Sequence, residues 1–326
     1  MKKIFITGIT GFCGSWLAEM LLENKPAVEV HGLARWRSPK DNILHILDGI
    51  HLHQGDLLDL SSLLKILDEE RPDYISHIAA QSYVPYSFDV PYATLEVNVL
   101  GSCNLFEAIK ILKVRDGYDP IVHVVSSSEC YGQVWKEDIP IKETQPFRPA
   151  SPYAVSKVAE DMLAWQYWLS YGIKTIRTRA FTKTGPRRGE VFVVSNFAKQ
   201  IAAIEVGRQE PVIHVGNLDS VRTFLDVRDA VRAYWLVFSK CESGEVYNIG
   251  GNTTMTVGEM LQKLIDMSSA KDEIEISVDQ DRMRPSDVTL QIPCIKKFQD
   301  ATGWKPEIPF ETTLRDTLDY WRDYFK

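Results

Sequence analysis

The sequence predicts an α/β protein with a doubly wound parallel sheet, followed by a smaller, mixed α/β C-terminal lobe. Over the first half of the chain, short apolar runs alternate with helix-like stretches, the order that builds parallel βαβ units. A glycine-rich turn follows the first apolar run. After about residue 181, Gly and Pro become more frequent and the elements shorten. We expect a sheet domain at 1–180 and a lobe mainly at 181–326, from which some segments return to the sheet.

The apolar runs place the strands, and the helical periodicity places the helices between them. Runs rich in Ile, Val and Leu with few charges predict buried parallel strands. Stretches with apolar residues three and four positions apart predict amphipathic helices. Strands are expected at 3–7, 28–34, 50–54, 74–79 and 121–126, and helices at 15–23, 60–67, 96–110 and 153–170.

Composition narrows the class of protein. The 326 residues include 37 Lys and Arg against 44 Asp and Glu, a net charge of −7, which argues against a nucleic-acid partner. No apolar stretch is long enough to span a bilayer, and Gly8 and Gly11 interrupt the apolar N-terminal run that a signal peptide would need. The five cysteines form no C-x-x-C pair. We expect a cytoplasmic protein with reduced thiols, no membrane partner and no metal site.

The glycine-rich turn at residues 8–14 predicts a dinucleotide site in a Rossmann-type domain. Gly8, Gly11 and Gly14 lie between the first strand and the first helix. Such glycines permit a tight turn and let a pyrophosphate reach bare backbone at a helix N-terminus. The alternative is an ordinary tight turn. The intervening Thr10, Phe12 and Cys13 are expected to touch the cofactor with the glycines.

The end of the second strand indicates which cofactor binds. NAD sites usually place an acidic residue there, whereas NADP sites place Arg near the extra phosphate. The chain has no Asp or Glu at this point and instead has Arg35 and Arg37. We therefore favour NADP, although NAD stays possible and both arginines could simply be solvated.

Tyr153 and Lys157 form the predicted catalytic pair. They are four residues apart, hence on one face of a helix, and Ser151 followed by Pro152 is typical of a helix start. A tyrosine with its ordinary pKa of about 10 is a poor base at neutral pH. A nearby ammonium favours the phenolate and would make Tyr153 a usable acid and base. The serines at 126–128 follow a strand end, where such sheets place their chemistry.

These motifs together resemble the extended short-chain dehydrogenase/reductase family over essentially the whole chain. Within it, the sequence is most similar to GDP-mannose 4,6-dehydratases and the related GDP-4-keto-6-deoxymannose reductases. The stretches that carry the resemblance are TGITG at 7–11, HLHQGDL at 51–57, AQS at 80–82, IPIKETQPF at 139–147, SPYAV at 151–155 and PRRGE at 186–190. FAKQI at 197–201, VGNL at 215–218 and RPSD at 284–287 are as similar to the reductases as to the dehydratases.

The resemblance implies a role for individual residues. Ser127, Glu129, Tyr153 and Lys157 would be catalytic. Besides residues of the glycine turn and the two arginines, the cofactor would touch Asp56, Leu57, Ala80, Gln81, Ser82, Tyr153, Lys157 and Arg188. The substrate would touch Tyr83, Thr182, Asn196, Lys199, Asn217, Arg222, Arg284 and Asp287. Among these, Arg222 and Arg284 have the guanidinium that forks onto a diphosphate, and Asp287 the carboxylate that binds ribose hydroxyls. Arg187 and Lys199 are weaker candidates for the same end.

Two positions depart from the family pattern. Thr182 stands where the family usually has Asn, and Lys183 where the dehydratases have His. The resemblance implies a 4,6-dehydratase acting on GDP-mannose or a similar GDP-hexose. The alternatives are a GDP-4-keto-6-deoxy-sugar 4-reductase, a nucleotide-sugar 4-epimerase, and a non-enzymatic NADP-sensing module, which would not need Ser127, Tyr153 and Lys157.

The predicted helices at 96–110 and 153–170 have apolar faces, for example at Leu163, Trp165 and Trp168. Exposed faces of this kind pair helices across a dimer axis, whereas burial within one chain would leave a monomer. Together with the resemblance, this predicts a homodimer or homotetramer.

Overall fold

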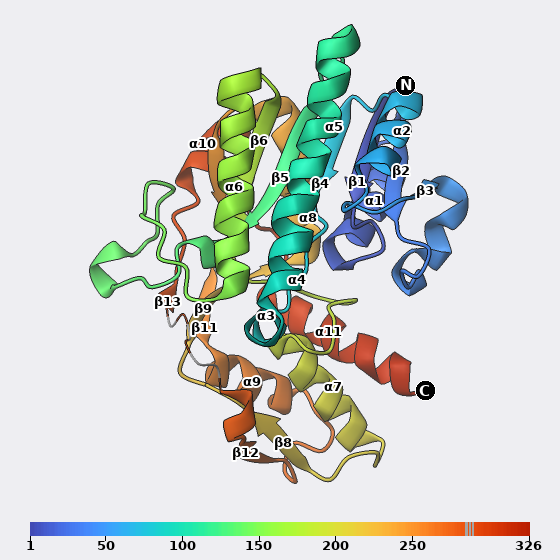
Figure 1. The fold of residues 1–326 in the computed structure, drawn as a ribbon. Helices are drawn as coiled ribbons and strands as arrows, with labels where there is room; N and C mark the ends of the chain where they lie inside the picture. The colour runs from blue at the N-terminus through green and yellow to red at the C-terminus, as the bar shows by residue number, and fades with distance from the viewer. Residues whose placement is uncertain (284–285, 287, 289) are drawn as a thin grey trace.

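The core of the protein is a seven-stranded parallel sheet. The computed structural model describes residues 1–283, 286, 288 and 290–326 (Figure 1). The strand order is β10-β6-β5-β4-β1-β2-β3, and all neighbouring strands are parallel. The strands are β1 (Lys2–Thr7), β2 (Val28–Ala34), β3 (His51–Gln54), β4 (Tyr74–His77), β5 (Ile121–Ser127), β6 (Lys174–Ala180) and β10 (Val246–Ile249). The order reverses between β1 and β4, where open α/β sheets bind ligands.

Helices cover both faces of this sheet, so its central strands are buried on both sides. On one face, α2 (Leu60–Glu70), α5 (Gly101–Asp116) and α6 (Pro152–Tyr171) pack through a single apolar cluster (Figure 1). On the other face, α1 (Phe12–Asn24) and α8 (Val227–Lys240) form a second cluster. The predicted doubly wound α/β architecture is confirmed.

The predicted elements of the first half are present, with small differences at their ends. The strand expected at 74–79 ends at His77, because the following residues leave the sheet and line a cavity. The helix expected at 96–110 opens with a π-helical turn at Glu96–Leu100 before α5 begins. Shorter elements of this half are α3 (Val84–Asp89), α4 (Pro91–Leu95) and the 3-10 turns Asp41–Gly49, Ser128–Cys130 and Lys136–Asp138.

A smaller mixed lobe lies against one end of the sheet and has its own apolar cluster (Figure 1). Its helices are α7 (Val193–Glu205), α9 (Val257–Asp266) and α11 (Phe310–Phe325). Strand β9 (Val221–Asp226) pairs with β7 (Lys183–Thr184), β11 (Thr253–Thr256) and β13 (Leu290–Gln291), and β8 (Val212–Val215) pairs with β12 (Glu275–Val278). A 3-10 turn at Gln280–Arg282 follows β12.

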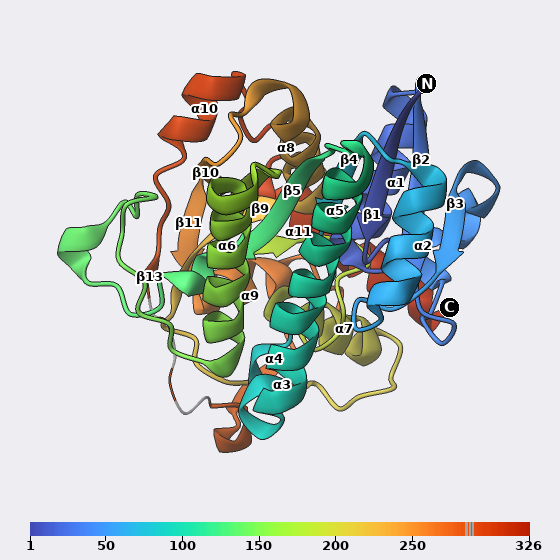
Figure 2. The same ribbon diagram turned by 45° about the horizontal axis from the view of Figure 1, so that its top comes forward.

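Three segments from beyond residue 181 pack in the main sheet domain. Strand β10 extends the sheet at β6, and α8 packs against α1. Helix α10 (Lys296–Thr302) contacts β10 and α8 (Figure 2). The two parts of the molecule are therefore interleaved in sequence. Within the described residues, no helix is long and apolar enough to cross a membrane.

Candidate active site

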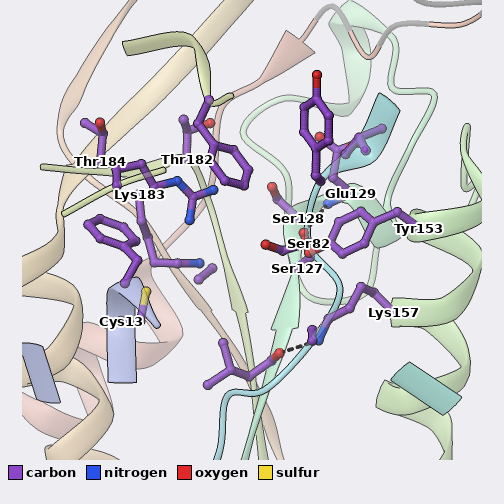
Figure 3. A pocket seen from close by; sticks show the side chains of 18 of the residues that line it. Cys13, Ser82, Ser127, Ser128, Glu129, Tyr153, Lys157, Thr182, Lys183 and Thr184 are labelled. Carbon is purple, nitrogen blue, oxygen red and sulfur yellow. Dashed lines mark hydrogen bonds between the residues drawn. The ribbon is translucent and has the colours of Figure 1, made fainter. Parts of the chain in front are cut away.

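A cavity of about 320 Å³ opens at the carboxyl ends of β1, β4, β5 and β6, between the main sheet and the smaller lobe. It lies where the strand order reverses, the position that the fold predicts for a ligand. Figure 3 shows two sides to it: Cys13 and Lys183 lie on one, and Glu129, Tyr153 and Lys157 on the other.

The glycine turn forms one wall and fits a close approach of phosphate to backbone. Gly8 has φ +73, and a Cβ on Gly14 would lie 2.1 Å from the Gly8 carbonyl oxygen. Helix α1 begins immediately after Gly11, whose missing side chain leaves the first helical N–H groups uncapped. Uncapped N–H groups at a helix N-terminus bind anions. The cavity is lined by Gly8, Gly11, Phe12, Cys13 and Gly14.

The opposite wall is the first turn of α6. The Ser151 hydroxyl accepts a hydrogen bond from the Ala154 N–H at 3.0 Å, and Pro152 occupies the first helical turn, so the helix start predicted from these residues is confirmed. This start places Tyr153 and Lys157 on the cavity side. Asp161 on the same helix bonds both Arg177 and Arg179 of β6 in the buried interior, which fixes the position of the helix on the sheet.

Lys157 is held by two buried partners. Its ammonium donates to the Val125 carbonyl oxygen at 2.7 Å (Figure 3) and to Glu160 Oε2 at 2.6 Å. Burial raises the pKa of Glu160 to about 7, although the Lys157 ammonium opposes that shift. Burial lowers the pKa of Lys157, but Glu160 and Tyr153 outweigh it and the net pKa is raised. Lys157 therefore stays protonated.

Burial also changes the protonation state that we expect for Tyr153. Removal from water raises the pKa of the Tyr153 phenol above its usual value, and the Lys157 charge and the Ser127 hydroxyl only partly offset this. Part of the Lys157 charge is neutralised by Glu160, which the sequence pattern did not reveal. In the ligand-free protein Tyr153 is therefore a neutral phenol, suited to donate a proton and to lose one only when its surroundings change.

Glu129 is oriented by its own segment and by a distant one. It follows β5 in a single 3-10 turn, in which the Ser127 hydroxyl accepts a hydrogen bond from the Glu129 N–H at 3.2 Å. The Gln291 side chain of β13 donates to Glu129 Oε1 at 3.0 Å and accepts from the Ser128 hydroxyl at 3.2 Å. A carboxylate is thus fixed in the same cavity as Tyr153 and Lys157.

Cationic side chains face the cavity from the lobe side. Burial first, and the nearby Arg188 charge to a smaller extent, lower the pKa of Lys183 to about 8. The Arg188 guanidinium lies over the Phe192 ring at 3.4 Å and over the Phe12 ring at 4.9 Å. Arg222, 9% exposed, also lines the cavity. Three cations around one cavity favour a polyanionic ligand.

The structure brings only part of the predicted set together. Lining the cavity, besides the glycine turn and the four expected catalytic residues, are Ala80, Ser82, Tyr83, Thr182, Arg188 and Arg222. Outside its lining are Thr10, Arg35, Arg37, Asp56, Leu57, Gln81, Asn196, Lys199 and Asn217. Arg284 and Asp287 lie outside the described residues.

Several of these outlying residues have local partners. Lys199 forms an ion pair with Glu190. Asn196 donates to the Glu190 carbonyl oxygen and accepts from Gln200. Arg187 pairs with Glu19 at 2.5 Å and lies over the Trp16 ring.

Gln291 and Glu160 are the residues that sequence reasoning missed. Gln291 is 162 residues from the carboxylate that it holds, and a lone Gln in a two-residue strand gives no pattern. Glu160 could have been found, because it is three residues from Lys157 on the same helix and that spacing brings two side chains together.

Comparisons with known proteins show the family to which the chain belongs. Residues 5–317 match the family described as GDP-mannose 4,6 dehydratase. A GDP-6-deoxy-D-mannose reductase of Pseudomonas aeruginosa is 34% identical over 321 residues, which cover 98% of this chain and 97% of that protein. A GDP-mannose 4,6-dehydratase of Yersinia enterocolitica is 34% identical over 348 residues, which cover 95% of this chain and 91% of that protein. The solved structure of RMD from Pseudomonas aeruginosa with NADPH has a TM-score of 0.85 at 34% identity and covers 99% of this chain and 100% of that one. The chain belongs to the GDP-mannose 4,6-dehydratase family.

Proposed function

We propose that this protein is a nucleotide-sugar 4,6-dehydratase that converts GDP-mannose or a similar GDP-hexose to the 4-keto-6-deoxy sugar. The observation that carries the proposal is Glu129, a carboxylate held by Gln291 in one cavity with Tyr153 and Lys157. Dehydration requires a base for the C5 proton in addition to the group that handles the C4 hydroxyl. The cavity supplies both.

NADP is the proposed cofactor, with NAD as the alternative. The bare backbone of Gly8, Gly11 and Gly14 fits a pyrophosphate, and the exposed Arg35 and Arg37 follow β2, where the adenosine ribose would lie. When bound, the nicotinamide supplies a place for hydride to be held and returned, so that dehydration needs no outside oxidant.

The chain's own side chains would then move the protons. Tyr153 takes the proton of the C4 hydroxyl as that carbon is oxidised, and Ser127 holds the same oxygen. The 4-ketone acidifies the C5–H bond, so that Glu129 can remove its proton and pass it to the C6 hydroxyl, which departs as water. C5 then regains a proton from solvent as C6 is reduced. Lys157 keeps a positive charge near the phenol and stabilises its ionised form.

The lobe side would bind the nucleotide diphosphate. Arg222, and Arg188 beside the glycine turn, both line the cavity, and an arginine can hold two phosphate oxygens at once. Lys183 introduces a further positive charge where the dehydratases have His. We propose that Tyr83 and Thr182, which line the same cavity, touch the sugar.

A GDP-4-keto-6-deoxy-sugar 4-reductase is the second candidate. The match to the Pseudomonas reductase spans 321 residues for 98% of this chain, so within the match that protein has hardly any residues that this chain lacks. The match to the Yersinia dehydratase spans 348 residues for 95% of this chain, so the dehydratase has insertions that this chain lacks. A reductase would use Tyr153 and Lys157 and consume NADPH.

Product analysis decides between the two. Purified protein with a catalytic amount of NADP is incubated with GDP-, UDP-, dTDP- and CDP-hexoses, and the products are read by mass spectrometry. We expect loss of one water from a GDP-hexose without net consumption of cofactor. If every GDP-hexose is unchanged while a GDP-4-keto-6-deoxy sugar oxidises NADPH, the reductase is the correct function.

Cofactor choice is tested by Arg35→Ala. Loss of a charge-assisted bond to the 2′-phosphate costs about 1.5–3 kcal/mol, so the NADP dissociation constant should rise about 10- to 100-fold while that of NAD changes little. Titration calorimetry on cofactor-free protein measures both, with Lys25→Ala as an exposed control. Equal losses for the two cofactors would remove Arg35 from the site.

We propose that the protein forms a homodimer, or a homotetramer built from such dimers, by pairing α5 and α6 with their copies. The two helices lie side by side over the sheet (Figure 1). They expose an apolar surface that includes Trp165 (37%), Leu169 (66%) and Val114 (83%). Burial of such a surface stabilises a dimer when about 800 Å² per subunit is covered.

Leu169→Glu should convert the oligomer to monomers in light scattering coupled to size-exclusion chromatography, since it places a charge in the paired surface. Val206→Glu is the matched control, because Val206 is also exposed (50%) but lies at the end of α7. A monomeric wild-type protein would contradict the pairing, and so would an unchanged mass for Leu169→Glu.

A further inference from the structure

Three histidines and two glutamates gather on strands β2 and β3 and the end of α2, outside the cavity described above. The members of this histidine cluster are Glu29, His31, His51, His53 and Glu70. His31 is buried at 1% side-chain exposure, whereas His53 and Glu70 are 18% and 25% exposed. A buried imidazole with two carboxylates and a second imidazole in reach is unusual unless the groups share protons or a cation.

We propose that His31, His53 and Glu70 bind a divalent transition-metal ion of the zinc type. The ligand atoms are His31 Nδ1, His53 Nε2 and a Glu70 carboxylate oxygen, which lie within 4.8 Å of one another. Two imidazoles and a carboxylate form a donor set that zinc accepts, with a fourth position for water.

The separations match a tetrahedral site. Metal–ligand bonds of about 2.0–2.1 Å place neighbouring ligand atoms roughly 3.3 Å apart. Here His31 Nδ1 lies 2.9 Å from His53 Nε2 and 3.5 Å from Glu70 Oε2, and His53 Nε2 lies 4.0 Å from Glu70 Oε1. The two Glu70 distances are to different carboxylate oxygens. With one oxygen per carboxylate the three ligand atoms lie within 4.8 Å of one another, so the longest pair would close by up to about 1.5 Å through side-chain rotation.

The two rings already direct nitrogen toward nitrogen. Their planes differ by 8° and their centroids are 5.2 Å apart, so the short contact between His31 and His53 lies close to both ring planes, where the lone pairs point. In the metal-free protein a single proton occupies this contact. A metal ion about 2.0–2.1 Å from both nitrogens would lie off the line that joins them, so both rings would have to turn as the ion replaces that proton.

Glu29 provides an independent indication. The other ring nitrogen of His31, Nε2, lies 3.0 Å from Glu29 Oε1. Metal-bound histidines generally donate their second N–H to a carboxylate in this way, which fixes the tautomer and strengthens the ligand. This hydrogen bond leaves Nδ1 of His31 free to present its lone pair.

Local charge also favours a cation. The His31 and His53 rings lie among carboxylates. Glu29, Glu69 and Glu70 surround them. The Lys3 ammonium lies 2.9 Å from Glu70 Oε2. A bound metal ion would share the Glu70 carboxylate with this ammonium.

A bound ion would add to the strand pairing and the side-chain contacts that already hold these elements together. It would link the edge strand β3 to β2 and to the end of α2. We therefore expect Zn²⁺ to raise the unfolding temperature of the full chain without being needed for turnover.

The test uses the full chain stripped with a chelator and titrated with Zn²⁺ by calorimetry, and with Co²⁺ by visible absorption. We expect one equivalent to bind, with Co²⁺ bands of a four-coordinate nitrogen and oxygen site and no thiolate charge transfer. His53→Gln and Glu70→Gln should weaken Zn²⁺ by about 100-fold or more, and Glu29→Gln by about 10- to 100-fold. The smaller loss expected for Glu29→Gln distinguishes a residue that orients a ligand from the ligands themselves.

His51→Gln is the matched control. His51 lies on the same strand, its ring stacks on His31, and its side chain is 59% exposed, but it is outside the proposed ligand set, so its substitution should change the affinity less than about threefold. His53 and Glu70 are partly exposed, so their variants are expected to fold even if a His31 variant does not. Absence of Zn²⁺ binding up to millimolar concentration would overturn the proposal, as would equal losses for His51→Gln and His53→Gln.

Discussion

Tyr153→Phe is expected to lower kcat by about 10²–10⁴-fold, the usual contribution of a general acid or base. The substitution removes only the phenol oxygen. The ring should keep its packing against the cavity wall, where Tyr153 is 9% exposed. The dissociation constant of NADP and the unfolding temperature should therefore change little. Steady-state kinetics, calorimetry and thermal unfolding measure the three quantities on the same preparation.

The pH profile gives a second readout of the same group. Burial raises the pKa of Tyr153, so the ionised phenol is scarce at neutral pH and the wild-type rate should rise as the pH increases. Tyr153→Phe should lose this rise. Tyr86→Phe, at a tyrosine that is 42% exposed and outside the cavity lining, is the control with no expected effect. A loss smaller than tenfold for Tyr153→Phe would show that another group handles the sugar oxygen.

The sheet domain could be predicted from sequence because each of its signals is local. Strands β1, β2 and β5 are rich in apolar residues, whereas β3 (HLHQ) and β4 (YISH) are short and mixed. The start of α6 is indicated by Ser151 and Pro152, whose cap geometry the structure shows. Strand β10 could not be assigned to this sheet, because its partner β6 is about 70 residues earlier and a four-residue run does not specify its neighbour.

The site residues, like the elements of the fold, could be predicted only where their sequence signals are local. The glycine turn, Ser127, Tyr153 and Lys157 lie at fixed positions next to strand or helix ends, so the fold brings them together. Gln291 reaches Glu129 from β13, and Glu160 changes the charge balance around Lys157 by being buried. Neither long-range pairing nor burial of a single charge leaves a periodic signal in sequence. The histidine cluster is similar, since His31 and His53 meet only through the pairing of β2 with β3.

Glu129→Gln tests the dehydration step itself, and its expected effect on kcat is as large as that of Tyr153→Phe. Gln keeps the size of the side chain and its hydrogen bond to Gln291, but it cannot remove the C5 proton. We expect kcat for dehydration of a GDP-hexose to fall about 10²–10⁴-fold. Oxidation at C4 relies on Tyr153, Lys157 and Ser127 and not on Glu129, so it should still occur and leave reduced nicotinamide on the enzyme, visible by its absorbance. Gln291→Leu, which only frees the carboxylate, should cost much less.

Isotope labelling separates this outcome from a reductase. In deuterated water the wild-type dehydratase should place solvent deuterium at C5, because the C5 proton taken by Glu129 departs with the C6 hydroxyl as water and C5 regains one from solvent. A reductase oxidises one NADPH for each product molecule and labels no carbon from solvent, and its rate would depend on Glu129 only through the shape of the cavity. Unlabelled C5 together with wild-type turnover in Glu129→Gln would remove the carboxylate from the chemistry and with it the dehydratase assignment.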